Sequence, residues 1–194
     1  MTDTSLAFDE QLLLLINGGH SPFMDELMWI FSSKWINLPL AIFLFIFLKR
    51  QFSWKKASLI FVLLLVVIAL TDFVSTQLFK DNFQRLRPSH TLGIQEKLHF
   101  YYISAADPYR GGRYGFVSSH AANLSSLLAF LYPFLIVHKR IFYLLLTYVL
   151  IVGYSRIYLG VHFPSDVICG GVLGLILGWL FQKHIFAKLL DKWD

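Results

Sequence analysis

Long apolar runs separated by short polar connections dominate the hydrophobic pattern of this chain. A helix that crosses a bilayer needs roughly 20 mostly apolar residues. Residues 57–79 form the clearest such run, and a less uniform run over residues 24–48 contains Lys34 and Pro39. Three further runs end or begin at short polar connections: residues 121–137, 141–154 and 166–182. The pattern therefore predicts about five transmembrane helices.

The segment before these runs has a different character. The stretch LAFDEQLLLLINGG, residues 6–19, is too short to span a bilayer and mixes acidic with apolar residues, which favours an amphipathic helix lying at the membrane interface. The first ten residues, MTDTSLAFDE, are acidic and lack the basic start of a cleavable signal peptide. The apolar runs themselves are therefore expected to direct membrane insertion.

Composition supports the same fold class. Of the 194 residues, 56% are hydrophobic and 17% aromatic, whereas soluble domains are usually about 45–50% apolar. We therefore predict an all-α integral membrane bundle that forms a single domain over residues 1–194. The lone Cys169 excludes an intramolecular disulfide. The net charge of +5 is compatible with anionic lipid or a phosphate-bearing substrate, and its distribution argues against a nucleic-acid partner.

Basic residues in the short connections predict the orientation. KRQFSWKK lies between the first two runs, HKR between the third and fourth, and KHIFAKLLDKW follows the last. All three fall on one side, which the positive-inside rule makes cytoplasmic. The segment 80–116 then lies outside although it is also basic, which suggests that an anion binds there. Of its cations, Arg85, Arg110 and Arg113 are interpreted as interfacial anchors.

Three polar clusters reach this outer level. In KDNFQRLRP, Lys80 and Arg87 are seven residues apart, so a continued helix would place them on one face. In FVSSHAAN, Ser118 or Ser119 can cap a helix that carries His120 in its first turn.

In the third cluster, SRIYLGVHFPSD, Asp166 follows His162 by four residues and can hydrogen-bond its imidazole. Together with Arg156 these clusters supply cations, hydroxyls, two histidines and a carboxylate, which are the groups that phosphoryl transfer requires.

These clusters resemble the signature of the type 2 phosphatidic acid phosphatase family, and in particular a bacterial undecaprenyl-diphosphatase-like member. The resemblance rests on their order and on the spacing within them: K-x6-RP, SSH and SR-x5-H-x3-D. The resemblance spans Lys80 to Asp166. It implies a phosphatase that works through a phosphohistidine intermediate without metal or other cofactor. By position, His162 would be the nucleophile, Asp166 its orienting carboxylate and His120 the general acid. The phosphate would be held by Lys80, Arg87, Arg156, Ser118 and the Ser119 amide.

One position departs from the family pattern. Pro-Ser-Gly-His is usual there, and this chain has Val117-Ser118-Ser119-His120, so the amide donor is kept and a hydroxyl is added. Outside the signature, Asp72 lies within the second apolar run. An intramembrane carboxylate suggests function by default, but a structural partnership with a neighbouring polar group is favoured here. Lys34 is left without an assigned role.

The resemblance implies a lipid phosphate or diphosphate substrate, with undecaprenyl diphosphate as the first choice. Phosphatidylglycerol phosphate, phosphatidic acid and lipid A phosphates are the alternatives. The expected location is the bacterial cytoplasmic (inner) membrane, with the site facing the outer, periplasmic side. The oligomeric state is left open. A lipid or anion transporter that uses the same cations is the rival of another class, and the soluble vanadium haloperoxidases are a more distant one.

Overall fold

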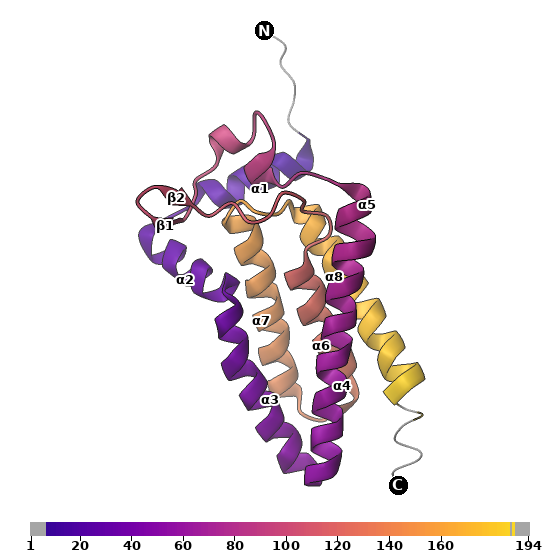
Figure 1. The fold of residues 1–194 in the computed structure, drawn as a ribbon. Helices are drawn as coiled ribbons and strands as arrows, with labels where there is room; N and C mark the ends of the chain where they lie inside the picture. The colour runs from indigo at the N-terminus through magenta and orange to yellow at the C-terminus, as the bar shows by residue number, and fades with distance from the viewer. Residues whose placement is uncertain (1–6, 187, 189–194) are drawn as a thin grey trace.

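The computed structural model describes residues 7–186 and 188, and it shows a bundle of long helices (Figure 1). This confirms the predicted all-α membrane class. The ends of the predicted domain and the last part of the basic tail lie outside the described residues. The α-helices are α1 (Phe8–Gly18), α2 (Pro22–Ser32), α3 (Asn37–Gln51), α4 (Trp54–Phe73), α5 (Asp81–Phe83), α6 (Ser119–Leu135), α7 (Lys139–Tyr158) and α8 (Pro164–Phe181). Two π-helical stretches, Val74–Lys80 and Gln182–Phe186, extend α4 and α8, and short 3₁₀ turns cover Lys34–Ile36, Pro88–His90 and Gln95–Lys97.

The N-terminal segment forms a helix, as its composition predicts. In Figure 1, α1 lies across the end of the long helices rather than alongside them. Its Leu13 is fully buried against Ile94 and Phe163. Asn17, also buried, donates hydrogen bonds to the carbonyl oxygens of His99 and Tyr158, at 2.9 and 2.7 Å. The helix is thus fixed to the loop segment and to the end of α7.

The first apolar run, predicted as one span over residues 24–48, is broken in the structure. The axes of Pro22–Ser32 and Lys34–Gln51 meet at 62° around Ser33. Ser33 has an extended backbone, and its hydroxyl accepts a hydrogen bond from the Trp35 amide at 3.2 Å. A serine in this geometry ends one helix and begins the next. The prediction of one continuous helix was therefore wrong.

The remaining apolar runs form long helices close to their predicted ranges. Among the described residues, Trp54–Phe83, Lys139–Tyr158 and Pro164–Phe186 are long and apolar enough to span a membrane, and the bent pair would make a fourth span. Helix α6 has 17 residues, the lower limit of spanning length. The connections α3–α4 and α6–α7 and the end of α8 all lie at the end of the bundle away from α1 (Figure 1), so the three basic segments share one side.

Helix α6 is the centre of the bundle, and eleven of its 17 residues are buried. It packs against α8 so closely that three α8 glycines have no space for a side chain. A Cβ on Gly174 would overlap the Ala122 carbonyl oxygen, and one on Gly178 would overlap that of Ser126. A Cβ on Gly170 would lie 2.5 Å from the Ser118 carbonyl oxygen. We call this contact the α6–α8 seam, and it permits the backbones to approach as small residues do in membrane helices.

The outer segment between α5 and α6 is mostly loop and covers the end of the bundle near α1. It contains a short antiparallel pair, β1 (Tyr102–Ser104) and β2 (Asp107–Pro108). Trp29 of α2 stacks on Tyr101 and meets Tyr109 edge to face, with ring centroids 4.6 and 4.9 Å apart. These aromatic contacts hold the loop against α2.

The seam makes a test of packing possible. Gly174→Ala is expected to lower the free energy of unfolding by about 1–3 kcal/mol, because the added Cβ must push two backbones apart. Gly171→Ala is the matched control, since its Cβ would lie 3.6 Å from the Ser125 hydroxyl oxygen, an ordinary contact. Thermal unfolding in detergent measures both. Equal unfolding temperatures for the two variants would contradict the close seam.

Candidate active site

A cavity of about 550 Å³ lies between α3, α4, α6 and α7. Its polar end contains five of the eight residues predicted from the sequence: Lys80, Arg87, Ser119, His120 and His162. The apolar part of its lining comes from four helices: Leu40, Ala41, Leu44, Leu65, Ile68, Leu124, Leu127 and Val152. The cavity therefore joins a cluster of charged groups to a hydrocarbon-like interior.

A second hollow, of about 640 Å³ between α3 and α7, is larger but chemically poorer. Its lining is mostly apolar, with Arg140 as its one charged residue, and it contains no histidine or carboxylate. It offers no acid, base or nucleophile. The smaller cavity is therefore the candidate site.

His162 and Asp166 form a buried pair at the polar end. His162 is in the turn after α7 and Asp166 is in the first turn of α8, and both side chains are almost fully buried. His162 Nδ1 lies 3.5 Å from Asp166 Oδ2 and makes no hydrogen bond within the described residues. Catalytic hydrogen bonds are often long without substrate. With Nδ1 turned to the carboxylate, Nε2 is the ring nitrogen left for the cavity.

The environment of His162 keeps its imidazole neutral. Burial lowers the pKa of His162 well below 6.5, and the charges of Arg87 and Arg156 lower it further. A neutral imidazole has a free lone pair at physiological pH, which a nucleophile requires.

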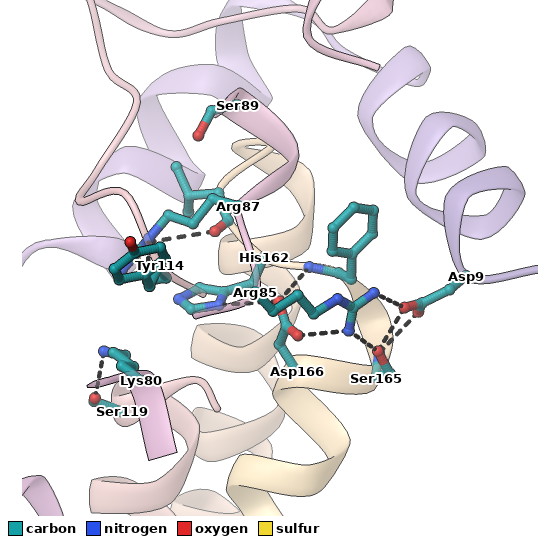
Figure 2. A network of polar contacts seen from close by, with 12 residues as sticks. Asp9, Lys80, Arg85, Arg87, Ser89, Tyr114, Ser119, His162, Ser165 and Asp166 are labelled. Atoms are coloured by element: carbon teal, nitrogen blue, oxygen red, sulfur yellow. Dashed lines mark hydrogen bonds and ion pairs between the residues drawn. The ribbon is translucent and has the colours of Figure 1, made fainter. Parts of the chain in front are cut away.

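Arg85 was predicted to be an interfacial anchor, and the structure gives it a different place. Its guanidinium donates to Asp166 Oδ1 at 2.8 Å and to Asp9 Oδ2 at 2.7 Å, and it lies 4.2 Å from the centroid of the Phe163 ring (Figure 2). Asp9 also accepts a 2.9 Å hydrogen bond from the Ser165 amide. The buried Asp166 carboxylate thus has a cationic partner, which a buried charge needs. No spacing in the sequence relates Asp9 to Arg85, so sequence reasoning missed this contact.

Ser119, at the position where the family usually has glycine, holds the lysine of the cluster. Its hydroxyl oxygen accepts from Lys80 Nζ at 2.7 Å (Figure 2). It also accepts from the Ser75 hydroxyl at 2.8 Å. The hydroxyl added at this position therefore positions the ammonium group that the signature supplies. Ser75 itself was not singled out in the sequence, where it appears as one polar residue in an apolar run.

Arg87 reaches the cavity from a loop and not from a helix face. The helix that carries Lys80 ends at Phe83, and Gln84 has a positive φ of 48°. The chain is then extended, and Arg87 Nε donates to the Tyr114 carbonyl oxygen at 3.1 Å (Figure 2). The expectation that Lys80 and Arg87 share a helix face was therefore wrong. Burial and the charge of Arg156 lower the pKa of Arg87 to about 10, so it remains charged at neutral pH.

Two predicted phosphate-binding residues lie behind the cavity wall. Ser118 begins α6, and its amide donates to the Asp166 carbonyl oxygen at 2.9 Å, while its buried hydroxyl has no hydrogen-bond partner within the described residues. Arg156 contacts the Ser32 hydroxyl and donates to the Tyr109 hydroxyl at 3.0 Å. Its Nε has no partner there. Neither residue lines the cavity, and both retain an unpaired polar atom near it.

A group of possible metal ligands lies elsewhere. Among the described residues, His20, Asp25 and His99 place their ligand atoms within 4.8 Å of one another. His99 Nε2 already contacts Asp25 Oδ2 at 3.0 Å, and the ring of His20 stacks on that of His99 at 3.7 Å. None of the three lines the cavity. The cavity itself combines cations with few carboxylates, which disfavours a divalent metal.

Comparisons with known proteins agree with this geometry. Residues 60–189, more than half of the chain, match the family model of the PAP2 superfamily. A lipid A 4'-phosphatase of Porphyromonas gingivalis is 33% identical over 193 residues, covering 97% of this chain and 77% of the relative. A lipid A 4'-phosphatase of Bacteroides thetaiotaomicron is 36% identical, covering 89% and 75%. The crystal structure of Aquifex aeolicus LpxE is 25% identical and superposes with a TM-score of 0.62, covering 95% of this chain and all of that one.

The contacts of Asp9 predict a pH-dependent stability. Partial burial raises the pKa of Asp9, but hydrogen bonds from Ser165 and Arg85 outweigh this and hold the pKa below its usual 3.8. A depressed carboxyl pKa stabilises the fold above the unfolded-state pKa, and this stability is lost as the pH falls through the folded-state pKa.

Asp9→Asn is therefore expected to lower the free energy of unfolding at pH 7 by about 1 kcal/mol, a value typical of partly exposed ion pairs. The difference from the parent should disappear between about pH 5 and pH 3. Thermal unfolding across this range measures it, with the exposed Asp107→Asn as the control. A deficit that stays constant down to pH 3 would contradict a charge-based role.

Proposed function

This chain belongs to the PAP2 superfamily and is a membrane phosphatase acting on lipid phosphates, and from that premise we propose that it removes a phosphate from a lipid A-type saccharolipid through a phosphohistidine intermediate. The observation that carries the proposal is the cavity, where Lys80, Arg87, Ser119, His120 and His162 meet at one end of an apolar chamber. A phosphorylated lipid likewise has two parts, a charged phosphate group and hydrocarbon chains.

The residues support a two-step reaction. Nε2 of neutral His162 attacks phosphorus, and the bond between phosphorus and the lipid oxygen breaks. His120 donates a proton to that leaving oxygen, as a general acid does. Water then attacks phosphorus, the bond between phosphorus and Nε2 breaks, and His120 takes up the proton that the water loses. This releases phosphate, returns His162 to the neutral imidazole and returns His120 to the protonated form that acts as the acid. Asp166 fixes the His162 tautomer and stabilises the cation that forms, and Arg85 positions Asp166.

The cations supply the electrostatic part of the reaction. Lys80 and Arg87 line the cavity and would neutralise the oxygens of the transferring phosphoryl group. Ser119 holds Lys80 in place through its hydroxyl and offers its amide at the start of α6. Arg156 and Ser118 lie just behind, with unpaired Nε and hydroxyl groups that could reach the phosphate after a side-chain movement.

The substrate ranking from the sequence changes. Undecaprenyl diphosphate was the first choice, and lipid A phosphate was an alternative. Relatives at 33% and 36% identity, matched over most of their length, carry the name lipid A 4'-phosphatase. They support the alternative over the first choice. A transporter remains the rival of another class, and it would need no imidazole paired with a carboxylate.

Phosphate release is expected from a lipid A-type phosphate by the purified chain in detergent, and it should survive a strong chelator because the cavity lacks a carboxylate cluster for a metal. His162→Ala should reduce turnover at least about 1,000-fold, since no neighbouring group can form the same covalent intermediate. His138→Ala, at the far end of the bundle, is the control.

Two results would count against the proposal. Loss of activity with the chelator, followed by recovery on added magnesium, would contradict metal independence. Binding of lipid phosphate without phosphate release would favour the transporter.

We propose the bacterial cytoplasmic membrane as the location, with an orientation that rests on charge. The three basic segments lie at the end of the bundle away from α5 and the start of α8 (Figure 1), and Lys80 and His162 of the polar cluster are next to these two elements in the chain. If the basic segments face the cytoplasm, as the positive-inside rule proposes, the polar end of the cavity opens at the periplasmic leaflet.

Labelling of introduced cysteines tests this orientation in a Cys169→Ala background. Gly112→Cys, in the exposed outer loop, should react with a membrane-impermeant thiol reagent in cells whose inner membrane is intact. Ser53→Cys, in the α3–α4 connection, should react only after lysis. The reverse pattern would place the active site on the cytoplasmic side and would leave the phosphatase chemistry untouched.

A further inference from the structure

Among the cavity-lining polar side chains that the phosphoryl-transfer chemistry does not use, two contact each other. Asp72 of α4 and Asn123 of α6 both line the cavity, and Asn123 Nδ2 donates to Asp72 Oδ1 at 3.0 Å. Because a carboxylate can only accept, this contact also fixes the amide orientation of Asn123. Asp72 was interpreted from the sequence as the structural partner of a neighbouring polar group. The contact with Asn123 agrees with that interpretation, but it involves only one of the two carboxylate oxygens of Asp72.

The pair presents two acceptors without donors. Within the described residues, Asn123 Oδ1 is buried and has no hydrogen-bond partner, whereas Asp72 is an exposed residue whose Oδ2 accepts no hydrogen bond. Lys34 lines the same cavity, but no ion pair joins it to Asp72 within the described part of the chain. An acceptor left unpaired in apolar surroundings is costly. A ligand that brings hydrogen-bond donors to this position would satisfy both atoms.

The position of the pair relates it to the phosphate cluster. Asp72 precedes Lys80 by eight residues, roughly 12 Å along a helix. Asn123 follows His120 by three residues, so it lies on the same face of α6 one turn deeper. The two acceptors therefore lie on the lipid side of the cluster, where the part of a substrate next to its phosphate would be held.

We propose that Asp72 and Asn123 form a specificity subsite that hydrogen-bonds the hydroxyl and amide N–H groups of an acylated sugar beside its phosphate. This inference rests on the proposed function and adds the residues that select the substrate class. A polyprenyl chain has no donor at this depth, and neither has phosphatidic acid. A site that must hydrogen-bond its substrate rejects an analogue without the donors, because its own polar groups are then left unpaired.

The test compares two substrates on the full-length chain in detergent: a lipid A-type acylated glucosamine phosphate and dioleoyl phosphatidic acid. Asp72→Asn keeps an oxygen that can accept from Asn123, so the link between α4 and α6 can persist, while the charged acceptor is lost. The variant is expected to lower kcat/KM for the sugar lipid about tenfold, the effect of one hydrogen bond to a charged group. For phosphatidic acid the change should stay within about twofold.

Asn123→Ala should shift the ratio of the two kcat/KM values in the same direction. Gln77, in the π-helical stretch that extends α4, is exposed and does not line the cavity, so Gln77→Leu is the control and should leave the ratio unchanged. Equal losses on both substrates would show that the pair only joins α4 to α6, and no loss on either substrate would show that the pair binds no hydrogen-bond donor of the substrate. Either result overturns the inference about the pair. The proposed function still stands if the parent hydrolyses the sugar lipid. A parent that does not hydrolyse the sugar lipid overturns both.

Discussion

The close contact between α6 and α8 is the constraint on which the rest of the site depends. The Ser118 amide donates to the Asp166 carbonyl oxygen at 2.9 Å, and Gly170 leaves no space for a Cβ above Ser118. This contact brings the start of α6, with Ser119 and His120, beside the start of α8. Two motifs more than 30 residues apart in the sequence thereby share one end of the bundle. In a membrane, where lipid tails are as apolar as side chains, such packing replaces the hydrophobic drive.

The second requirement is a partner for each buried charge. Asp166 is fully buried, and Arg85 joins it to Asp9 of α1. Helix α1, which carries no signature residue, therefore helps to fix the carboxylate behind His162. Lys80 depends in the same way on the hydroxyl of Ser119. Since an unpaired charge in a low-dielectric interior is costly, these contacts stabilise Asp166 and Lys80 in their positions in the site.

The cavity joins this polar cluster to apolar helix surfaces. Its chemistry changes along its length from cations and imidazoles, through the Asp72–Asn123 pair, to leucine, isoleucine and valine side chains. A substrate with three matching parts, phosphate, donor-bearing sugar and acyl chains, satisfies each portion. The family determines the reaction, and the middle portion of the cavity is where relatives can differ in substrate without a change in catalytic groups.

The sequence by itself determined the apolar runs, the shared side of the basic connections and the signature residues, because hydropathy, charge and motif spacing are local properties of the chain. Only the tertiary structure decided the rest. The break at Ser33 lies in a run whose overall hydropathy suggested one span, and Arg87 reaches the site through a loop that its seven-residue spacing from Lys80 concealed. Arg85 meets Asp9 across 76 residues, and Ser165 meets Asp9 across 156. No periodicity encodes such pairs, since they arise only when α1 is laid across the end of the bundle.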